Sequence, residues 1–451
     1  MLALGEMSAM FPVSGSFSTY SKRFGSDSLG FAVLSNYWFN DACSVASDLV
    51  ALQLVFDYWH VESMPWWGIS LIFWFALLFM NLGSVYIYGE TEYLLAVLKV
   101  VTIIIFFIMG IICNAGLNDT GHYLGFKYFN YKDVHHGFIN GFRGFSSIFV
   151  TTAFSFGGLE SITLTAGETS NPTRQIPKTI KAVFLRIMIF YIFTALFIGI
   201  NVPYDYPNLS TKSAATSPFT IVFQQVGASG GGSFMNAVIL TSILSAGNHA
   251  LYAGSRLAFN LSTQNYIPKI FAYTNRFNVP WVAVFITWLI SGLCFASAFV
   301  KSGVLWSWLQ SIVGLSNLIS WWVIGVISLR FRRGLKVQNR EHELIFKNWT
   351  YPYGPWFVVI FGGFIILVQG WTTFSPFSVA DFFESYLELG VFPLCFILWW
   401  LIKRDKFVRA KDMDFDTDRY YQTQEELDEA EYEKSLKGWA KFKYNFVDNF
   451  L

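Results

Sequence analysis

The sequence predicts an all-α polytopic membrane protein, and three observations lead to this fold class. Of the 451 residues, 54% are hydrophobic and only 14% are charged, whereas soluble domains carry about 25% charged residues. Apolar segments of about the 20 residues that a membrane helix needs recur along the chain. Amphipathic rings such as Tyr86, Tyr88, Trp399 and Trp400 lie at segment ends, where the headgroup layer favours them.

These segments number ten, which is too many for the buried helices of a soluble protein. Each boundary carries an error of a few residues. The net charge of +1 gives no reason to expect a nucleic acid partner, and the four cysteines show no disulfide or metal-binding pattern. The expected spans are 29–56, 66–86, 93–115, 143–166, 183–203, 235–257, 280–300, 304–329, 355–374 and 386–402.

Lysine and arginine set the orientation of these spans. If the chain starts on the inner side, thirteen of the loop lysines and arginines fall in inner loops and four in outer loops. Cytoplasmic loops carry such an excess of positive charge. Because ten is even, both ends of the chain are expected in the cytoplasm.

The first span, 29–56, contains two aspartates, Asp41 and Asp48. They are seven residues apart and therefore share one face of a helix. A charge inside a bilayer is costly, so each aspartate is expected to line a cavity or to find a partner. For Asp41, which is nearer the helix end, an interfacial or packing role is an equal alternative.

Two further spans carry polar residues. Lys99 is the only charge past the first turn of span 93–115; it either extends to the interface or acts as an internal cation in place of a metal ion. Ser242 and Ser245 cluster in span 235–257. Small hydroxyl residues of this kind either pack helices closely or serve as ligands.

Span 143–166 contains Gly157, Gly158 and Glu160 in its middle. Irregular backbone inside a membrane survives only where protein or a water-filled cavity surrounds it. We therefore expect residues 154–158 to be non-helical, which is typical of the broken helices of secondary transporters. Glu160 would orient this turn or take part in proton coupling. The alternative is a kinked packing helix with one buried acid.

Several runs resemble fungal amino acid permeases of the amino acid–polyamine–organocation superfamily. They include AFSFGGLESITLTAGETSNPTRQIPKTIK from residue 153, GETEYLLAVLKVVTIIIF from residue 89 and LTSILSAGNHALYAGSR from residue 240. The resemblance implies an inverted-repeat transporter fold with five plus five helices and two more. It also implies that the chain lacks the first helix and most of the second of that family, and that substrate lies between the first and sixth helices.

The resemblance assigns roles to individual residues. Phe154, Ser155, Phe156, Gly157 and Gly158 match the unwound segment that contacts the substrate backbone. Lys99 matches a lysine that stands in for sodium, with Ser242 and Ser245 on the helix that faces it. Asp48 matches an acidic position of the third helix. Ser316 and Asn317 lie on the tenth helix, which is expected to form a specificity wall.

The expected function is proton-coupled amino acid uptake across the plasma membrane, with basic amino acids as the favoured substrates. The alternatives are an amino acid receptor on the same scaffold and a non-functional truncated permease. No cofactor is expected, and no nucleophile–base pair suggests an enzyme. The expected domains are residues 1–28, a helix end and cytoplasmic loop, 29–402, the permease domain, and 403–451, a cytoplasmic tail that would bind trafficking or ubiquitin-ligase adaptors.

Overall fold

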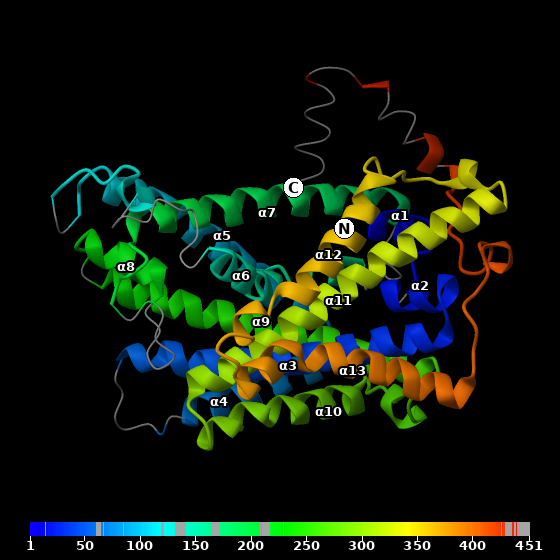
Figure 1. Cartoon of the computed structure of the whole chain (residues 1–451), viewed down its shortest axis with the longest axis horizontal. Coiled ribbons are helices and arrows are strands. Elements are labelled where there is room, and N and C mark those ends of the chain that lie inside the picture. Colours follow the sequence, from blue (N-terminus) through cyan, green and yellow to red (C-terminus); the bar gives the residue numbers. More distant parts are fainter. Residues whose placement is uncertain are drawn as a thin grey trace.

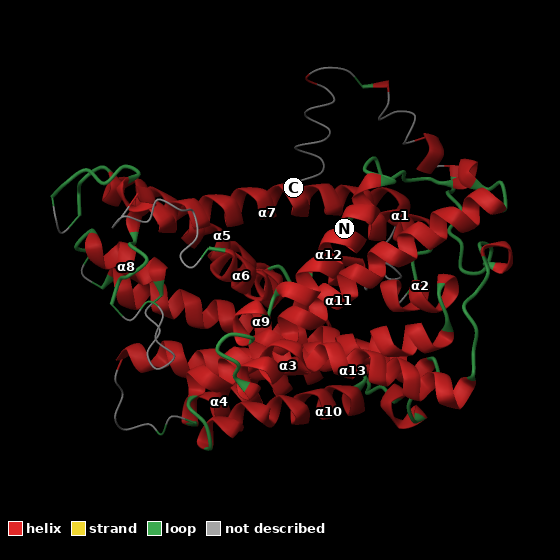
Figure 2. Cartoon of the chain, viewed as in Figure 1, coloured by secondary structure: helices red, strands yellow, loops and turns green. Residues whose placement is uncertain are grey.

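Helices connected by loops make up the described part of the chain, in which an isolated bridge between Phe374 and Phe377 is the only β-type pairing (Figure 2). The structure is a computed structural model. It describes residues 1–13, 15–59, 65, 67–83, 85–118, 121–130, 141–163, 171–207, 209, 217–228, 230–424, 426–428, 435–436 and 439.

The α-helices differ widely in length, and the longest are longer than the roughly 20 residues that cross a bilayer. They are α1 (Leu2–Met10), α2 (Ser16–Phe24), α3 (Asp27–Phe56), α4 (Gly68–Leu82), α5 (Val85–Asn114), α6 (Phe142–Ser155), α7 (Pro172–Asn201), α8 (Pro218–Gln225), α9 (Gly231–Thr263), α10 (Trp281–Ser291), α11 (Ser302–Val337), α12 (Tyr353–Val368) and α13 (Val379–Lys403).

Short 3₁₀ helices extend or connect several of them. They are η1 (Asp57–Trp59), η2 (Lys127–Asn130), η3 (Leu159–Thr163), η5 (Lys269–Ala272), η6 (Gly292–Ala298), η7 (Glu341–Glu343), η8 (Trp371–Thr373) and η9 (Ala410–Asp412).

The structure confirms an all-α polytopic membrane protein and corrects several span boundaries. Among the described residues, eight helices are long and apolar enough to cross a membrane. The other two of the ten expected spans correspond to α4, which has 15 residues, and to α6, which has 14. Residues 66, 84 and 164–166 of the expected spans lie outside the described residues.

The boundary between α4 and α5 differs most from the expectation. The expected spans ended at 86 and began again at 93, but α4 ends at Leu82, the following Gly83 has an extended backbone, and α5 begins at Val85. Two acidic residues, Glu90 and Glu92, therefore lie inside α5 and not in a loop.

Helix α3 occupies the centre of the helical bundle. It packs most extensively against α9 and next against α11 (Figure 1). Ser26 caps its first turn by accepting a hydrogen bond of 3.1 Å from the N–H of Leu29, and Asp27 places a negative charge at this end of the helix. In Figure 1, α7 and α10 lie along opposite long sides of the molecule.

At one end of the molecule, α1, α2 and the C-terminal end of α11 lie together; we call this the α2 end (Figure 1). Aromatic rings fill its core, and one of them comes from the segment after α13. Phe415 is fully buried, and its ring centroid lies 5.5 Å from that of Phe24 and 5.9 Å from that of Phe331. The segment around Phe415 is therefore part of the folded core.

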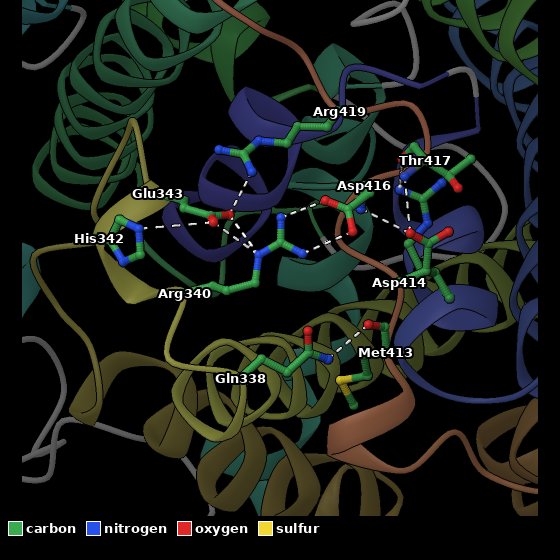
Figure 3. A network of polar contacts seen from close by, with 10 residues as sticks. Gln338, Arg340, His342, Glu343, Met413, Asp414, Asp416, Thr417 and Arg419 are labelled. Carbon is green, nitrogen blue, oxygen red and sulfur yellow. Dashed lines mark hydrogen bonds and ion pairs between the residues drawn. The ribbon is translucent and has the colours of Figure 1, made fainter.

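Ion pairs fix this segment at the surface of the α2 end (Figure 3). Arg340 donates to both carboxylate oxygens of Asp416, at 2.6 and 3.0 Å, and also contacts Glu343. Arg340 holds the pKa of Asp416 below its usual range, and hydrogen bonds from Thr417 hold the pKa of Asp414 at about 2. Both aspartates therefore stay ionised at neutral pH.

A second ion pair at the α2 end is buried. Glu6 of α1 accepts two hydrogen bonds from Arg332 of α11, at 2.5 and 3.0 Å, and a third from the N–H of Asn348. Glu6 is 1% exposed and Arg332 is 9% exposed. The pair joins the first helix of the chain to the longest one.

We expect Glu6→Gln to destabilise the protein strongly, because it leaves the Arg332 guanidinium buried without a counter-charge. Breaking a buried ion pair in this way costs about 3–5 kcal/mol. Thermal unfolding in detergent would show this as a clear fall in melting temperature. The control is Asp418→Asn, which removes the exposed partner of Arg23 and should cost under about 1 kcal/mol. Equal melting temperatures for the two variants would contradict the expectation.

Candidate functional site

Helix α6 is broken where the sequence predicts. Its α-helical part ends at Ser155, a turn follows over 156–158, and η3 then runs from Leu159 to Thr163. Gly158 has a φ of +83°, which favours glycine over other residues. The prediction of a break is confirmed, but Phe154 and Ser155 are still helical, so the unwound turn is shorter than expected.

The backbone carbonyls at the break have partners from other elements. Tyr191 of α7 donates to the carbonyl of Ser155 at 2.6 Å, and its ring stacks on Phe156 with centroids 4.4 Å apart. The carbonyl of Gly158 accepts from the hydroxyl of Ser161 at 2.5 Å. The carbonyl of Gly158 also accepts from the backbone N–H of Ser161 at 3.2 Å. Unsatisfied backbone groups are costly inside a membrane, and both of these carbonyls have partners.

Asn317 of α11 joins the break to α3. Its amide nitrogen donates to the carbonyl of Ala153 at 3.3 Å, and its amide oxygen accepts from Asn40 at 2.7 Å. A Cβ atom on Gly157 would lie 2.3 Å from the Asn317 amide nitrogen. Gly157 is therefore required by the close approach of this amide.

The neighbouring Ser316 makes a similar contact. Its hydroxyl accepts a hydrogen bond of 2.7 Å from Asn36 of α3, and both Ser316 and Asn317 are almost completely buried. The two residues expected to form a specificity wall thus use polar atoms to connect α11 to α3 and α6.

Lys99 points into the bundle, as predicted. Its ammonium group donates to the hydroxyl of Ser245 on α9 at 2.7 Å. Ser242 lies on the same helix, and its hydroxyl donates to the carbonyl of Val238 in that helix. The expectation that Lys99 faces this helix is confirmed by the contact with Ser245.

Glu92 completes this cluster, and sequence reasoning missed it. Its carboxylate accepts from Ser245 at 2.6 Å and from Asn248 at 2.8 Å. Glu92 and Lys99 are seven residues apart and so lie on one face of α5. That spacing could have identified the pair, but the expected span began at residue 93 and placed Glu92 in a loop.

Asp41 and Asp48 lie on the face of α3 that meets α9, and a glycine of α9 faces each of them. A Cβ on Gly254 would lie 3.0 Å from the Cβ of Asp41, and one on Gly247 would lie 3.7 Å from the Cβ and Oδ2 of Asp48. The Oδ2 atoms of both aspartates are buried and have no hydrogen-bond partner among the described residues. The two glycines make room for the carboxylates between closely packed helices.

Glu160 follows the break and is 3% exposed. Neither carboxylate oxygen has a hydrogen bond of normal geometry with a described residue, although Tyr37 and Trp321 lie near enough to interact. Its backbone carbonyl accepts from the Thr163 hydroxyl at 2.7 Å. Glu160 also interacts electrostatically with Asp41, so these two carboxylates lie in one region of the bundle.

The region therefore combines three chemical features. It has an unwound backbone turn, carboxylate oxygens to which no described residue donates a hydrogen bond, and a lysine ammonium that donates to a serine. Unwound backbone in a membrane helix can bind both the ammonium and the carboxylate of a small zwitterion. The unpartnered carboxylates can attract a second positive charge.

Comparison with known proteins shows which proteins this chain is similar to. The amino acid permease family profile matches residues 1–411. A probable amino-acid permease of Schizosaccharomyces pombe is 40% identical over 446 residues, which cover 95% of this chain and 87% of that protein. The lysine-specific permease of Escherichia coli is 36% identical, covering 92% and 86%. The general amino-acid permease of Saccharomyces cerevisiae is 36% identical, covering 93% and 72%.

We expect Gly157→Ala to destabilise the protein by about 1–3 kcal/mol, as overpacking does, because the new Cβ displaces the Asn317 amide. In an Asn317→Ala background the same change should cost less, and unfolding of the four proteins in detergent measures the difference. The control is Gly390→Ala on α13, where a Cβ meets no atom within 4 Å. An equal cost of Gly157→Ala in both backgrounds would contradict the role given to Asn317.

Proposed function

The chain belongs to the amino acid permease family, and we propose that it takes up amino acids, preferentially basic ones, by coupling their entry to protons. The observation that carries the proposal is the contact of Lys99 with Ser245 on α9, the helix that also contacts the segment after the break through His249 and Ser161. It supplies a fixed internal cation on the same helix that contacts this segment.

We assign substrate binding to the unwound turn and its flanks, Phe154, Ser155, Phe156, Gly157 and Gly158, with Ser316 and Asn317 holding the turn in place. The turn is the part of α6 whose backbone leaves the helical hydrogen-bond pattern. An amino acid carries one ammonium and one carboxylate, and broken helices bind such groups through helix ends and freed carbonyls.

We assign proton coupling to Lys99 and Glu160, with Ser242 and Ser245 on the facing helix. A sodium-coupled carrier places a metal ion between helices, and a lysine ammonium can supply the same positive charge. Ser245 connects Lys99 to Glu92 through two short hydrogen bonds, so a change in the charge of one group would alter the position of the other.

The preference for basic amino acids rests on Asp48. Its Oδ2 is buried and has no hydrogen-bond partner in the part of the chain that the structure describes, and Lys99 is near enough to interact with the carboxylate electrostatically. A lysine or arginine side chain would neutralise this carboxylate. Two similar proteins, from Escherichia coli and Saccharomyces cerevisiae, carry the name lysine-specific permease, which agrees with this proposal.

For location, we propose the plasma membrane with both chain ends in the cytoplasm, because positive charge is concentrated in the loops of one side. Residues 29–402 would form the permease domain, and 403–451 the tail that trafficking or ubiquitin-ligase adaptors recognise. A receptor that binds amino acids without moving them is the alternative, and uptake of radiolabelled lysine by cells that lack their own permeases distinguishes the two.

If Lys99 is the internal cation, Lys99→Ala should abolish proton-driven accumulation of radiolabelled lysine while the protein still reaches the membrane. Uptake with and without an uncoupler, normalised to surface protein, measures this. Lys301→Ala is the control, since Lys301 is exposed and precedes α11. Normal accumulation in the Lys99 variant would show that the Lys99–Ser245 contact only packs α5 against α9.

If Asp48 receives the side chain of a basic amino acid, Asp48→Asn should raise the KM for lysine roughly tenfold or more, because a charge-assisted interaction is lost. Uptake of a neutral amino acid should be spared. The control is Asp57→Asn, in which the exposed aspartate after α3 is changed.

Two other outcomes would overturn this role. Retained exchange with loss of uphill uptake, for both substrate classes, would make Asp48 a coupling residue. Unchanged uptake of both classes across pH would make it a packed, structural aspartate.

A further inference from the structure

His249 lies in the middle of α9 and contacts both α5 and the segment after the break. Its Nδ1 lies 3.0 Å from the hydroxyl of Tyr88 on α5, and its Nε2 lies 3.1 Å from the hydroxyl of Ser161 on η3. Ser161 in turn donates to the carbonyl of Gly158 at 2.5 Å. The side chain of His249 thus connects α5 and α9, through Ser161, to Gly158, the residue of the turn that has a positive φ.

The direction of these hydrogen bonds follows from the protons available. A serine hydroxyl has one proton, and that of Ser161 is used by the Gly158 carbonyl. With its proton directed at the carbonyl of Gly158, the Ser161 hydroxyl accepts from His249, and in this tautomer Nε2 carries a proton. In the neutral imidazole Nδ1 is then the acceptor for the Tyr88 hydroxyl. The hydrogen bonds then run in one direction: Tyr88 donates to His249, His249 donates to Ser161, and Ser161 donates to the carbonyl of Gly158.

The same helix face carries the contact to Lys99. Ser245 lies four residues before His249, so the two side chains project from neighbouring turns of α9. Ser245 contacts Lys99 and Glu92, whereas His249 contacts Ser161, whose hydroxyl donates to the turn at Gly158. Helix α9 therefore holds the internal cation and the unwound turn at a fixed separation.

Tyr88 is itself held firmly. Its ring stacks on Tyr252 with centroids 4.0 Å apart and an interplanar angle of 8°. The guanidinium of Arg256 lies 3.2 Å from the centroid of the Tyr252 ring. Because Tyr88 is fixed by stacking, its hydroxyl can orient the imidazole, and the imidazole can orient Ser161.

We propose that His249 is a positioning residue for amino acid binding: it holds the turn at Gly158 through Ser161. Because Ser245 lies on the same helix as His249, the turn then keeps a fixed position relative to the Lys99–Ser245 contact. The proposal rests on the proposed transport function. It assigns His249 no contact with substrate and no transfer of a proton. Removing the imidazole should loosen the turn and weaken amino acid binding, and should leave the coupling to protons intact.

The test compares His249→Ala, Ser161→Ala and His249→Gln with Thr241→Val as control. Thr241 lies on the same helix, and its hydroxyl donates to Val238 of that helix. His249→Ala and Ser161→Ala should each raise the KM for lysine exchange in proteoliposomes roughly three- to tenfold, the loss expected for one hydrogen bond. The double variant should be no worse than either single one. His249→Gln, which keeps an N–H donor, should recover most of the affinity.

A second measurement does not depend on transport. Hydrogen–deuterium exchange of the amides in 156–163 should be faster in His249→Ala and Ser161→Ala than in wild type and Thr241→Val. If the wild-type protein transports nothing, the proposed function fails, and faster exchange would still support the positioning role. Unchanged amide exchange together with wild-type affinity would overturn it. Loss of uphill uptake in His249→Gln as severe as in His249→Ala, with lysine exchange spared, would make His249 a proton carrier instead.

Discussion

A backbone group that leaves its helix inside hydrocarbon must find a partner within the protein, and the arrangement around α6 depends on this constraint. The helix stops at Ser155, and the carbonyls near the break are satisfied by side chains of α7, α11 and η3. Each partner must then be held in turn, and Asn40 holds the Asn317 amide. The central helix α3 thereby supports an irregular turn that it does not itself contain.

Charged side chains inside the bundle also need partners within the protein, but Lys99 and the aspartates of α3 differ in the neighbours that they have. The Lys99 ammonium has a hydroxyl partner that also contacts a carboxylate, so the cation and the anion are connected through a neutral group. The aspartates of α3 instead face glycines, which provide space and no polar atom. A buried carboxylate oxygen that has space around it, and no hydrogen bond from a described residue, can bind a positive charge that arrives with a ligand. The contacts of Lys99 and Glu92 with Ser245, by contrast, are already made without a ligand.

The fold class and the place of the break could be predicted from the sequence because each depends on local pattern. Apolar length predicts membrane helices, and adjacent glycines before a buried acid predict an interruption. The ends of α4 and α5 were misplaced because Gly83 ends one helix only two residues before the next begins. The partners of Asn317, Glu92 and His249 could not be predicted, because they come from helices far apart in sequence whose rotation is set by packing. The orientation of Lys99 toward Ser245 was predicted only because the family resemblance supplied the facing helix.

The burial of Phe415 between Phe24 and Phe331 has a consequence for the order of events during synthesis. The aromatic core of the α2 end joins Phe24 to Phe415, so it depends on a contact between residues far apart in the sequence. It cannot close until residue 415 has left the ribosome, when all of the α-helices from α1 to α13 have already been made. Until then α2 exposes Phe24 without its cover, and such transient apolar surface is what chaperones bind and what promotes aggregation. The core of the α2 end can therefore be completed only after α13 has been made.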